Sequence, residues 1–109
     1  MKIELLYFEG CPSYQTALRN LEQVLEEEKA GIPVDMVRIE SQEQALRNKF
    51  VGSPTVRING QDIEPGVRDL KDFSMCCRLY SEAGEITGWP SKDLIRHALK
   101  EAKEAYEQI

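Results

Sequence analysis

The residue with the clearest chemical potential in this sequence is Cys11, which stands between Gly10 and Pro12. Proline favours the first position of a helix, because its ring presets φ and its missing N–H needs no partner there. Pro12 therefore predicts that a helix begins directly after Cys11 and that Cys11 caps this helix. The partial positive charge at a helix N-terminus stabilises a thiolate, which is the reactive form of cysteine. We interpret Cys11 as an activated, nucleophilic thiol.

Two further cysteines, Cys76 and Cys77, are adjacent in an apolar run from Met75 to Tyr80 that predicts a strand. Neighbouring side chains of a strand point to opposite faces, so we expect only one of these sulfurs to face the site of Cys11. The pattern leaves open which of them it is. Because the chain has an odd number of cysteines, a purely structural disulfide framework would leave one unpaired.

The elements that must position these thiols follow from the spacing of apolar residues. A stripe at helical spacing predicts a long helix that begins at Pro12, and Ser91 can cap another one near the end of the chain. Asn59-Gly60 suits the turn of a hairpin, because both residues tolerate positive φ. The predicted order is a strand at 3–8, a helix at 12–29, a strand at 34–39, a short helix at 41–49 opened by a Ser41–Gln44 capping box, a hairpin at 55–64, a loop at 65–72, a strand at 75–80, a turn at 83–84 and a helix from 91.

This order predicts one α/β domain that covers residues 1–109. Two strands joined through a helix imply a right-handed parallel unit, and the hairpin adds antiparallel strands at one side. We therefore expect a three-layer fold with a mixed central sheet of about four to five strands and helices on both faces.

Charge and hydropathy exclude several classes of partner. The formal net charge of -5 argues against nucleic acid, because its phosphates would be repelled. No apolar run is long enough to cross a bilayer, which argues against a membrane partner. The chain begins with a strand pattern rather than a signal peptide, so we expect a cytoplasmic protein.

The order of elements, with Cys11 and its flanking glycine and proline after the first strand, resembles the thioredoxin superfamily. The segment from Val51 to Thr55 looks like the cis-proline element of that superfamily. The resemblance implies a thioredoxin-like fold with a cis bond between Ser53 and Pro54, close to Cys11. It also implies that a substrate chain docks there, with Pro12, Ser53 and Pro54 as the substrate-binding residues.

The sequence departs from the dithiol members of this superfamily at Tyr14, which stands where Cys-x-x-Cys has its second cysteine. A mixed disulfide at Cys11 must therefore be released by a thiol from elsewhere. Cys76 or Cys77 is the candidate for this resolving role. Tyr14 can either hydrogen-bond the sulfur or pack beside it.

The segment from Phe73 to Tyr80, with the turn and helix that follow it, is similar to the C-terminal part of organomercurial (alkylmercury) lyases. The resemblance implies that Cys76 acts together with Cys11 on carbon–mercury bonds. The aspartate that the family has beside the earlier cysteine is Tyr14 here, so the proton donor of that reaction is missing. Two soft thiolates still suit Hg(II) or a similar thiophilic ion. Cys11 and Cys76 are therefore a candidate metal pair, and the sequence implies no other cofactor.

Together these patterns predict thiol–disulfide exchange through the thiolate of Cys11, with a disulfide-bearing protein or a small thiol as the partner. One alternative is a binding protein for mercury or another thiophilic metal. Another is a redox-inactive thioredoxin-like module that only mediates interactions. The sequence leaves the substrate and the oligomeric state open.

Overall fold

The computed structural model describes residues 1–68, 70–82 and 84–107, with the backbone alone at 106–107. Its main sheet has four strands in the order β2-β1-β3-β4. β1 pairs in parallel with β2 and antiparallel with β3, and β3 pairs antiparallel with β4, so the sheet is mixed. The strands are β1 (Ile3–Tyr7), β2 (Val34–Arg38), β3 (Thr55–Ile58) and β4 (Gln61–Asp62).

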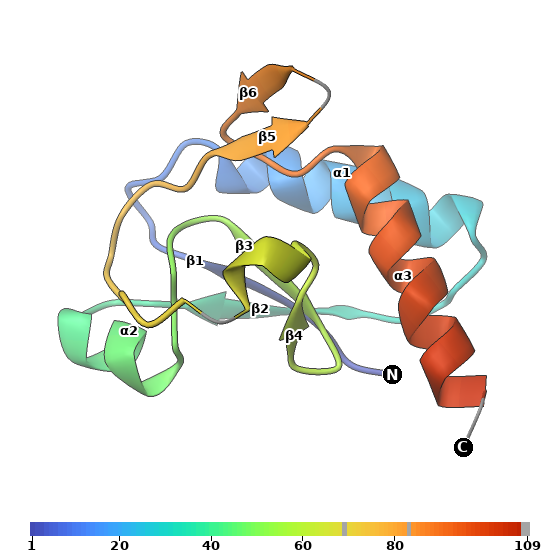
Figure 1. Cartoon of the computed structure of the whole chain (residues 1–109), viewed down its shortest axis with the longest axis horizontal. Helices are drawn as coiled ribbons and strands as arrows, with labels where there is room; N and C mark the ends of the chain where they lie inside the picture. The colour runs from blue at the N-terminus through green and yellow to red at the C-terminus, as the bar shows by residue number, and fades with distance from the viewer. Residues whose placement is uncertain (69, 83, 108–109) are drawn as a thin grey trace.

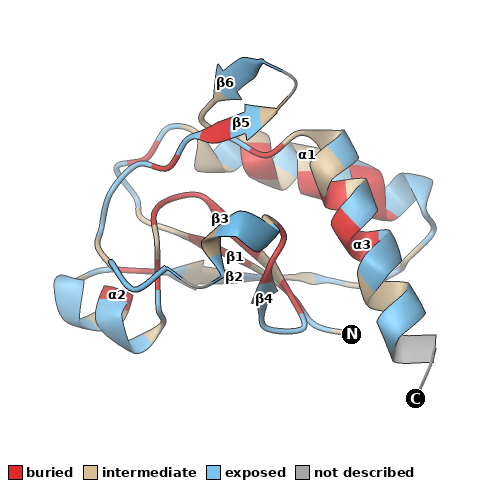
Figure 2. Cartoon of the chain, viewed as in Figure 1, coloured by how far each residue is buried: buried red, intermediate tan, exposed pale blue. Residues whose placement is uncertain are grey.

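Helices cover both faces of this sheet (Figure 1). Helices α1 (Tyr14–Glu27) and α3 (Lys92–Glu107) pack against each other on one face, and α2 (Gln42–Arg47) lies on the other. Neighbouring residues of β1 serve the two faces, because side chains alternate along a strand. Leu5 joins the core under α1 and α3, while Leu6 joins a second cluster with Phe50 beside α2. Figure 2 shows buried segments, in red, on both α1 and α3. The predicted three-layer, thioredoxin-like α/β fold is confirmed, with four strands in its mixed sheet.

Several element ends lie where local signals in the sequence predict them. Asn59 and Gly60, with φ of 54° and 82°, form the tight turn between β3 and β4. The Ser41 hydroxyl accepts a hydrogen bond from the Gln44 N–H at 3.1 Å, which caps α2. Ser91 caps α3 in the same way. These signals succeed because each depends on only a few neighbouring residues.

The predicted strand at 75–80 is wrong for most of its length. Residues 70–79, which we call the strap, run irregularly from the short 3₁₀ helix η1 (Pro65–Val67) to β5 (Tyr80–Glu82). Figure 1 shows the strap as the yellow-to-orange trace that passes beside the main sheet. It forms a single isolated bridge and no ladder, so the apolar run alone cannot make it a strand. β5 pairs instead with β6 (Glu85–Thr87), and the turn predicted at 83–84 includes Ala83, which lies outside the described residues.

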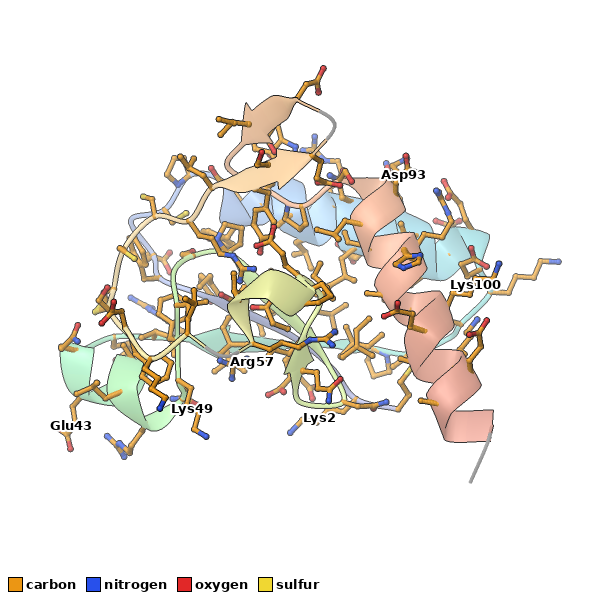
Figure 3. The ribbon with its side chains drawn as sticks, in the orientation of Figure 1. Lys2, Glu43, Lys49, Arg57, Asp93 and Lys100 are labelled. Carbon is orange, nitrogen blue, oxygen red and sulfur yellow. The ribbon has the colours of Figure 1, made fainter. Side chains whose placement is uncertain are left out.

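The outer faces of the helices are polar. Glu43 on α2 and both Asp93 and Lys100 on α3 are exposed and project away from the sheet (Figure 3). The long helices thus keep their apolar sides for the core. In the part of the chain that the structure describes, no helix has the length and apolar character to cross a membrane.

Candidate functional site

Cys11 is held at the end of β1 by a tight turn, in which its N–H donates to the Phe8 carbonyl at 3.1 Å. Helix α1 begins only at Tyr14, and its N-cap is Ser13, whose carbonyl accepts the first helical hydrogen bond. The prediction that Pro12 begins the helix and that Cys11 caps it is therefore wrong. Cys11 ends the turn that precedes the helix, so its sulfur does not act as the cap.

The surroundings of Cys11 are formed by the segment that the sequence identifies as a cis-proline element. The bond between Ser53 and Pro54 is cis. The Cys11 thiol donates to the Ser53 carbonyl at 3.6 Å. Cys11 is only 2% exposed, so little of its sulfur is open to a molecule from solvent. The structure thus brings the two predicted motifs together but buries the thiol between them.

The second thiol of this site is Cys77. Cys77 forms an isolated bridge with Ser53, whose carbonyl accepts the Cys11 thiol, so the two cysteines meet at the same residue. Cys77 is exposed. The thiol of Cys76 donates elsewhere, to the Val51 carbonyl at 3.7 Å. The structure therefore resolves which cysteine of the adjacent pair faces Cys11. Of the two members of the predicted metal pair, Cys11 and Cys76, the Cys76 thiol is thus directed to Val51 instead of to Cys11.

The surroundings of Cys77 raise the pKa of its thiol. Partial burial is the largest of the causes that raise the pKa of the Cys77 thiol above its ordinary value. Negative charge on Cys11 and the hydrogen bond between the thiols raise this pKa further.

Tyr14, which replaces the second cysteine of the usual motif, packs in this structure. Its ring stacks on that of Tyr7, with centroids 4.4 Å apart and planes 25° apart. Among the hydrogen bonds of the described residues, none joins Tyr14 to Cys11. Of the predicted substrate-binding residues, Pro12 is exposed, whereas Ser53 and Pro54 are buried.

Arg78, which the sequence-based interpretation misses, fixes the position of the neighbouring Cys77. Its guanidinium forms a bidentate ion pair with Asp62 at 2.6 and 2.9 Å, and it contacts Glu64 at 3.1 Å. It also lies over the ring of Tyr80, 4.4 Å from the centroid. A detectable signal exists, because Arg78 is the one charged residue in an apolar run and the hairpin supplies two carboxylates at strand spacing.

The comparisons with known proteins identify a family without identifying an activity. The family model described as "Domain of unknown function (DUF2703)" matches residues 3–99, a span that includes both thiols and Arg78. No match to the chain was found among curated proteins or among solved structures. The chemistry must therefore be argued from the geometry of the site.

Proposed function

The chain belongs to the family described as a domain of unknown function (DUF2703), and we propose that it is a thiol–disulfide oxidoreductase whose redox pair is Cys11 and Cys77. The observation that carries the proposal is that these two cysteines, from distant parts of the chain, meet at Ser53: the Cys11 thiol donates to the Ser53 carbonyl, and Cys77 forms an isolated bridge with Ser53. Cys11 also lies close enough to raise the pKa of the Cys77 thiol. Two cysteines on neighbouring backbone segments can be joined by a disulfide when their side chains turn toward each other. The second thiol that the first motif lacks is thus supplied by the strap.

The difference in exposure between the two thiols supports a division of roles. Cys77 is exposed and Cys11 is buried, so we assign the first attack on a substrate disulfide to Cys77. Its thiolate bonds to one substrate sulfur and releases the other as a thiolate, which takes up a proton. This assignment reverses the expectation from the sequence, in which Cys11 is the nucleophile, because that expectation depends on a helix cap that Cys11 does not provide.

Cys11 then completes the reaction as the resolving thiol. After losing its proton, it attacks the Cys77 sulfur of the mixed disulfide, and the second substrate thiolate leaves. The substrate disulfide has gained two electrons and two protons, and the protein has become a Cys11–Cys77 disulfide. A cellular dithiol returns the protein to its reduced form by the reverse exchange. The cytoplasm, where thiols are kept reduced, is the compartment that we propose for this cycle.

Controlled oxidation tests the proposal directly. We expect one equivalent of a small disulfide to convert the reduced protein to a monomeric species with a Cys11–Cys77 crosslink. The reason is that a second thiol held nearby in the same molecule competes far better than any thiol in solution. Proteolysis without reduction, followed by mass spectrometry, would identify the joined peptides.

The adjacent cysteine supplies a matched control for this experiment. Cys76→Ser should form the same crosslink, because the Cys76 thiol interacts with Val51 rather than with Cys11. A crosslink that uses Cys76, or a chain that leaves all three thiols free after oxidation, would contradict the assignment. The second outcome would favour a redox-inactive module that only mediates interactions.

A second candidate function, the binding of a thiophilic metal ion, is favoured by the same placement of two cysteines at Ser53. Hg(II) prefers thiolate ligands and is satisfied by two of them in a linear arrangement. We expect one Hg(II) per chain in a titration followed by ultraviolet absorbance. This binding should be lost in both Cys11→Ser and Cys77→Ser and kept in Cys76→Ser. Equal weakening by all three substitutions would argue against a defined two-thiol site.

A further inference from the structure

The backbone of Ser53, on which the resemblance predicts that a substrate chain docks, is already paired with the strap. The Ser53 N–H donates to the Cys76 carbonyl at 2.8 Å, and the Arg78 N–H donates to the Ser53 carbonyl at 3.0 Å. The Cys11 thiol also donates to this carbonyl. Since a carbonyl oxygen has two lone pairs, Ser53 has no backbone group left for a second chain.

The strap is held on this edge by buried side chains as well as by its backbone. The side chain of Arg78 is only 5% exposed, and it bonds to Asp62 and Glu64 on the hairpin side of the sheet. The Tyr80 hydroxyl donates to the Pro54 carbonyl at 2.6 Å. These contacts lie at the C-terminal end of the Ser53 pairing and directly after it, in β5, so a chain that displaced the strap from Ser53 would have to break them as well.

The fit between the strap and the cis-proline segment is also close. Gly52 has a φ of +135°, and a Cβ added there would come within 2.9 Å of the Arg78 Cβ. The absence of a side chain at Gly52 thus lets the two backbones approach. This spacing leaves no room for another strand between Ser53 and the strap.

From this arrangement we infer that the substrate of the pair is a low-molecular-weight disulfide rather than a disulfide within an extended polypeptide, an inference that rests on the proposed function. The strap that covers Ser53 also carries Cys77. A polypeptide that took the Ser53 edge would therefore displace the thiol that attacks it and separate this thiol from Cys11. A small disulfide needs only the exposed sulfur of Cys77 and no backbone pairing.

A matched pair of substrates tests the inference on the wild-type protein. One is the mixed disulfide of glutathione with N-acetylcysteine amide, and the other joins glutathione to the central cysteine of an extended peptide of about ten residues. Both give two thiols and the Cys11–Cys77 disulfide when they oxidise the reduced protein. We expect the second-order rate constants to agree within about threefold, whereas two backbone hydrogen bonds to a docked chain would favour the peptide by about tenfold or more.

The same peptide with serine in place of its cysteine gives an independent readout of docking. We expect no inhibition of the reaction with the small disulfide when this peptide is present in excess. Preference for the peptide substrate, or inhibition by the serine peptide, would overturn the inference while leaving the proposed function intact. Reaction with neither disulfide would overturn the proposed function and the inference together. In Cys77→Ser both reactions should disappear, which confirms that the measured rates belong to this site.

Discussion

Replacing Cys77 with serine is expected to lower the rate of exchange with a small disulfide by about a thousandfold or more, because a hydroxyl cannot replace the attacking thiolate. Cys11→Ser should behave differently. Its exposed Cys77 can still attack, but the thiol that would release the mixed disulfide has been removed, and the neighbouring Cys76 thiol is directed to Val51. We therefore expect a burst of one equivalent of released thiol, followed by arrest with the substrate bound at Cys77. Stopped-flow detection of thiol release, with mass spectrometry of the arrested protein, distinguishes the two variants.

The adjacent Cys76 again provides the matched control, since Cys76→Ser removes an exposed thiol from the same strap. Its rate should stay within about twofold of wild type. If Cys76→Ser lost activity while Cys77→Ser kept it, the assignment of the attacking thiol would be wrong. A burst from Cys77→Ser with the substrate bound at Cys11 would instead restore Cys11 to the role that the sequence predicts for it.

The pH profile of the wild-type rate follows from the position of Cys77. Burial first, and then the charge and hydrogen bond of Cys11, raise the pKa of the Cys77 thiol. The thiolate fraction at neutral pH is therefore small, and each unit of pH should increase the rate about tenfold until the raised pKa is passed. In Cys11→Ser the burst rate should level off at a lower pH, because the charge of Cys11 is no longer present to disfavour the Cys77 thiolate.

The fold and half of the site are predictable from the sequence because their signals are local. The Asn59-Gly60 turn and the Ser41 cap each depend on a few adjacent residues. The cis bond at Pro54 comes from a resemblance to a short motif, and the structure has it. The burial of Cys11 and the start of α1 at Tyr14 depend instead on a turn whose bonds the sequence pattern does not reveal.

The other half of the site depends on a long-range contact that no local pattern specifies. The apolar run around Cys76 and Cys77 has the composition of a strand, but no neighbouring strand offers it a ladder. Which of the two sulfurs faces Cys11 is decided by how the strap pairs with Ser53, and this pairing is stabilised by Arg78. Alternation along a strand predicts that only one sulfur can face Cys11, and the structure decides that it is Cys77.

Replacing Arg78 with methionine should destabilise the protein by about 3–5 kcal/mol, the usual cost of leaving one member of a buried ion pair unpaired. The side chains of Arg78 and Asp62 are only 5% and 8% exposed. Burial alone would lower the pKa of the Arg78 guanidinium, but Asp62 and Glu64 raise it above its ordinary value, so Arg78 stays charged at every pH at which thiols react. Urea unfolding of the reduced protein measures this change as a lower midpoint with an unchanged slope.

Two further variants separate the buried ion pair from charge in general. Arg96→Met removes an arginine whose bond to Glu27, at 2.8 Å, lies on the exposed surface. It should change the midpoint far less, because water and salt screen such pairs. The double variant Arg78→Met with Asp62→Leu should recover much of the loss, since it removes the buried carboxylate, whereas the remaining partner Glu64 is partly exposed to water. If this double variant were no more stable than Arg78→Met, packing rather than the unpaired carboxylate would be the cause.

The Arg78→Met substitution also connects the stability of the protein to the proposed thiol chemistry. Arg78 holds the strap through its side chain, and a Cys11–Cys77 disulfide would hold the same segment through a covalent bond. We therefore expect Arg78→Met to lower the free energy of unfolding less in the oxidised protein than in the reduced one. The reason is that the crosslink restricts the strap in the folded and in the unfolded chain. Equal losses in both redox states would mean that Arg78 stabilises the hairpin side of the sheet without positioning Cys77. A smaller loss on oxidation is expected only if the ion pair and the thiol pair act on one segment.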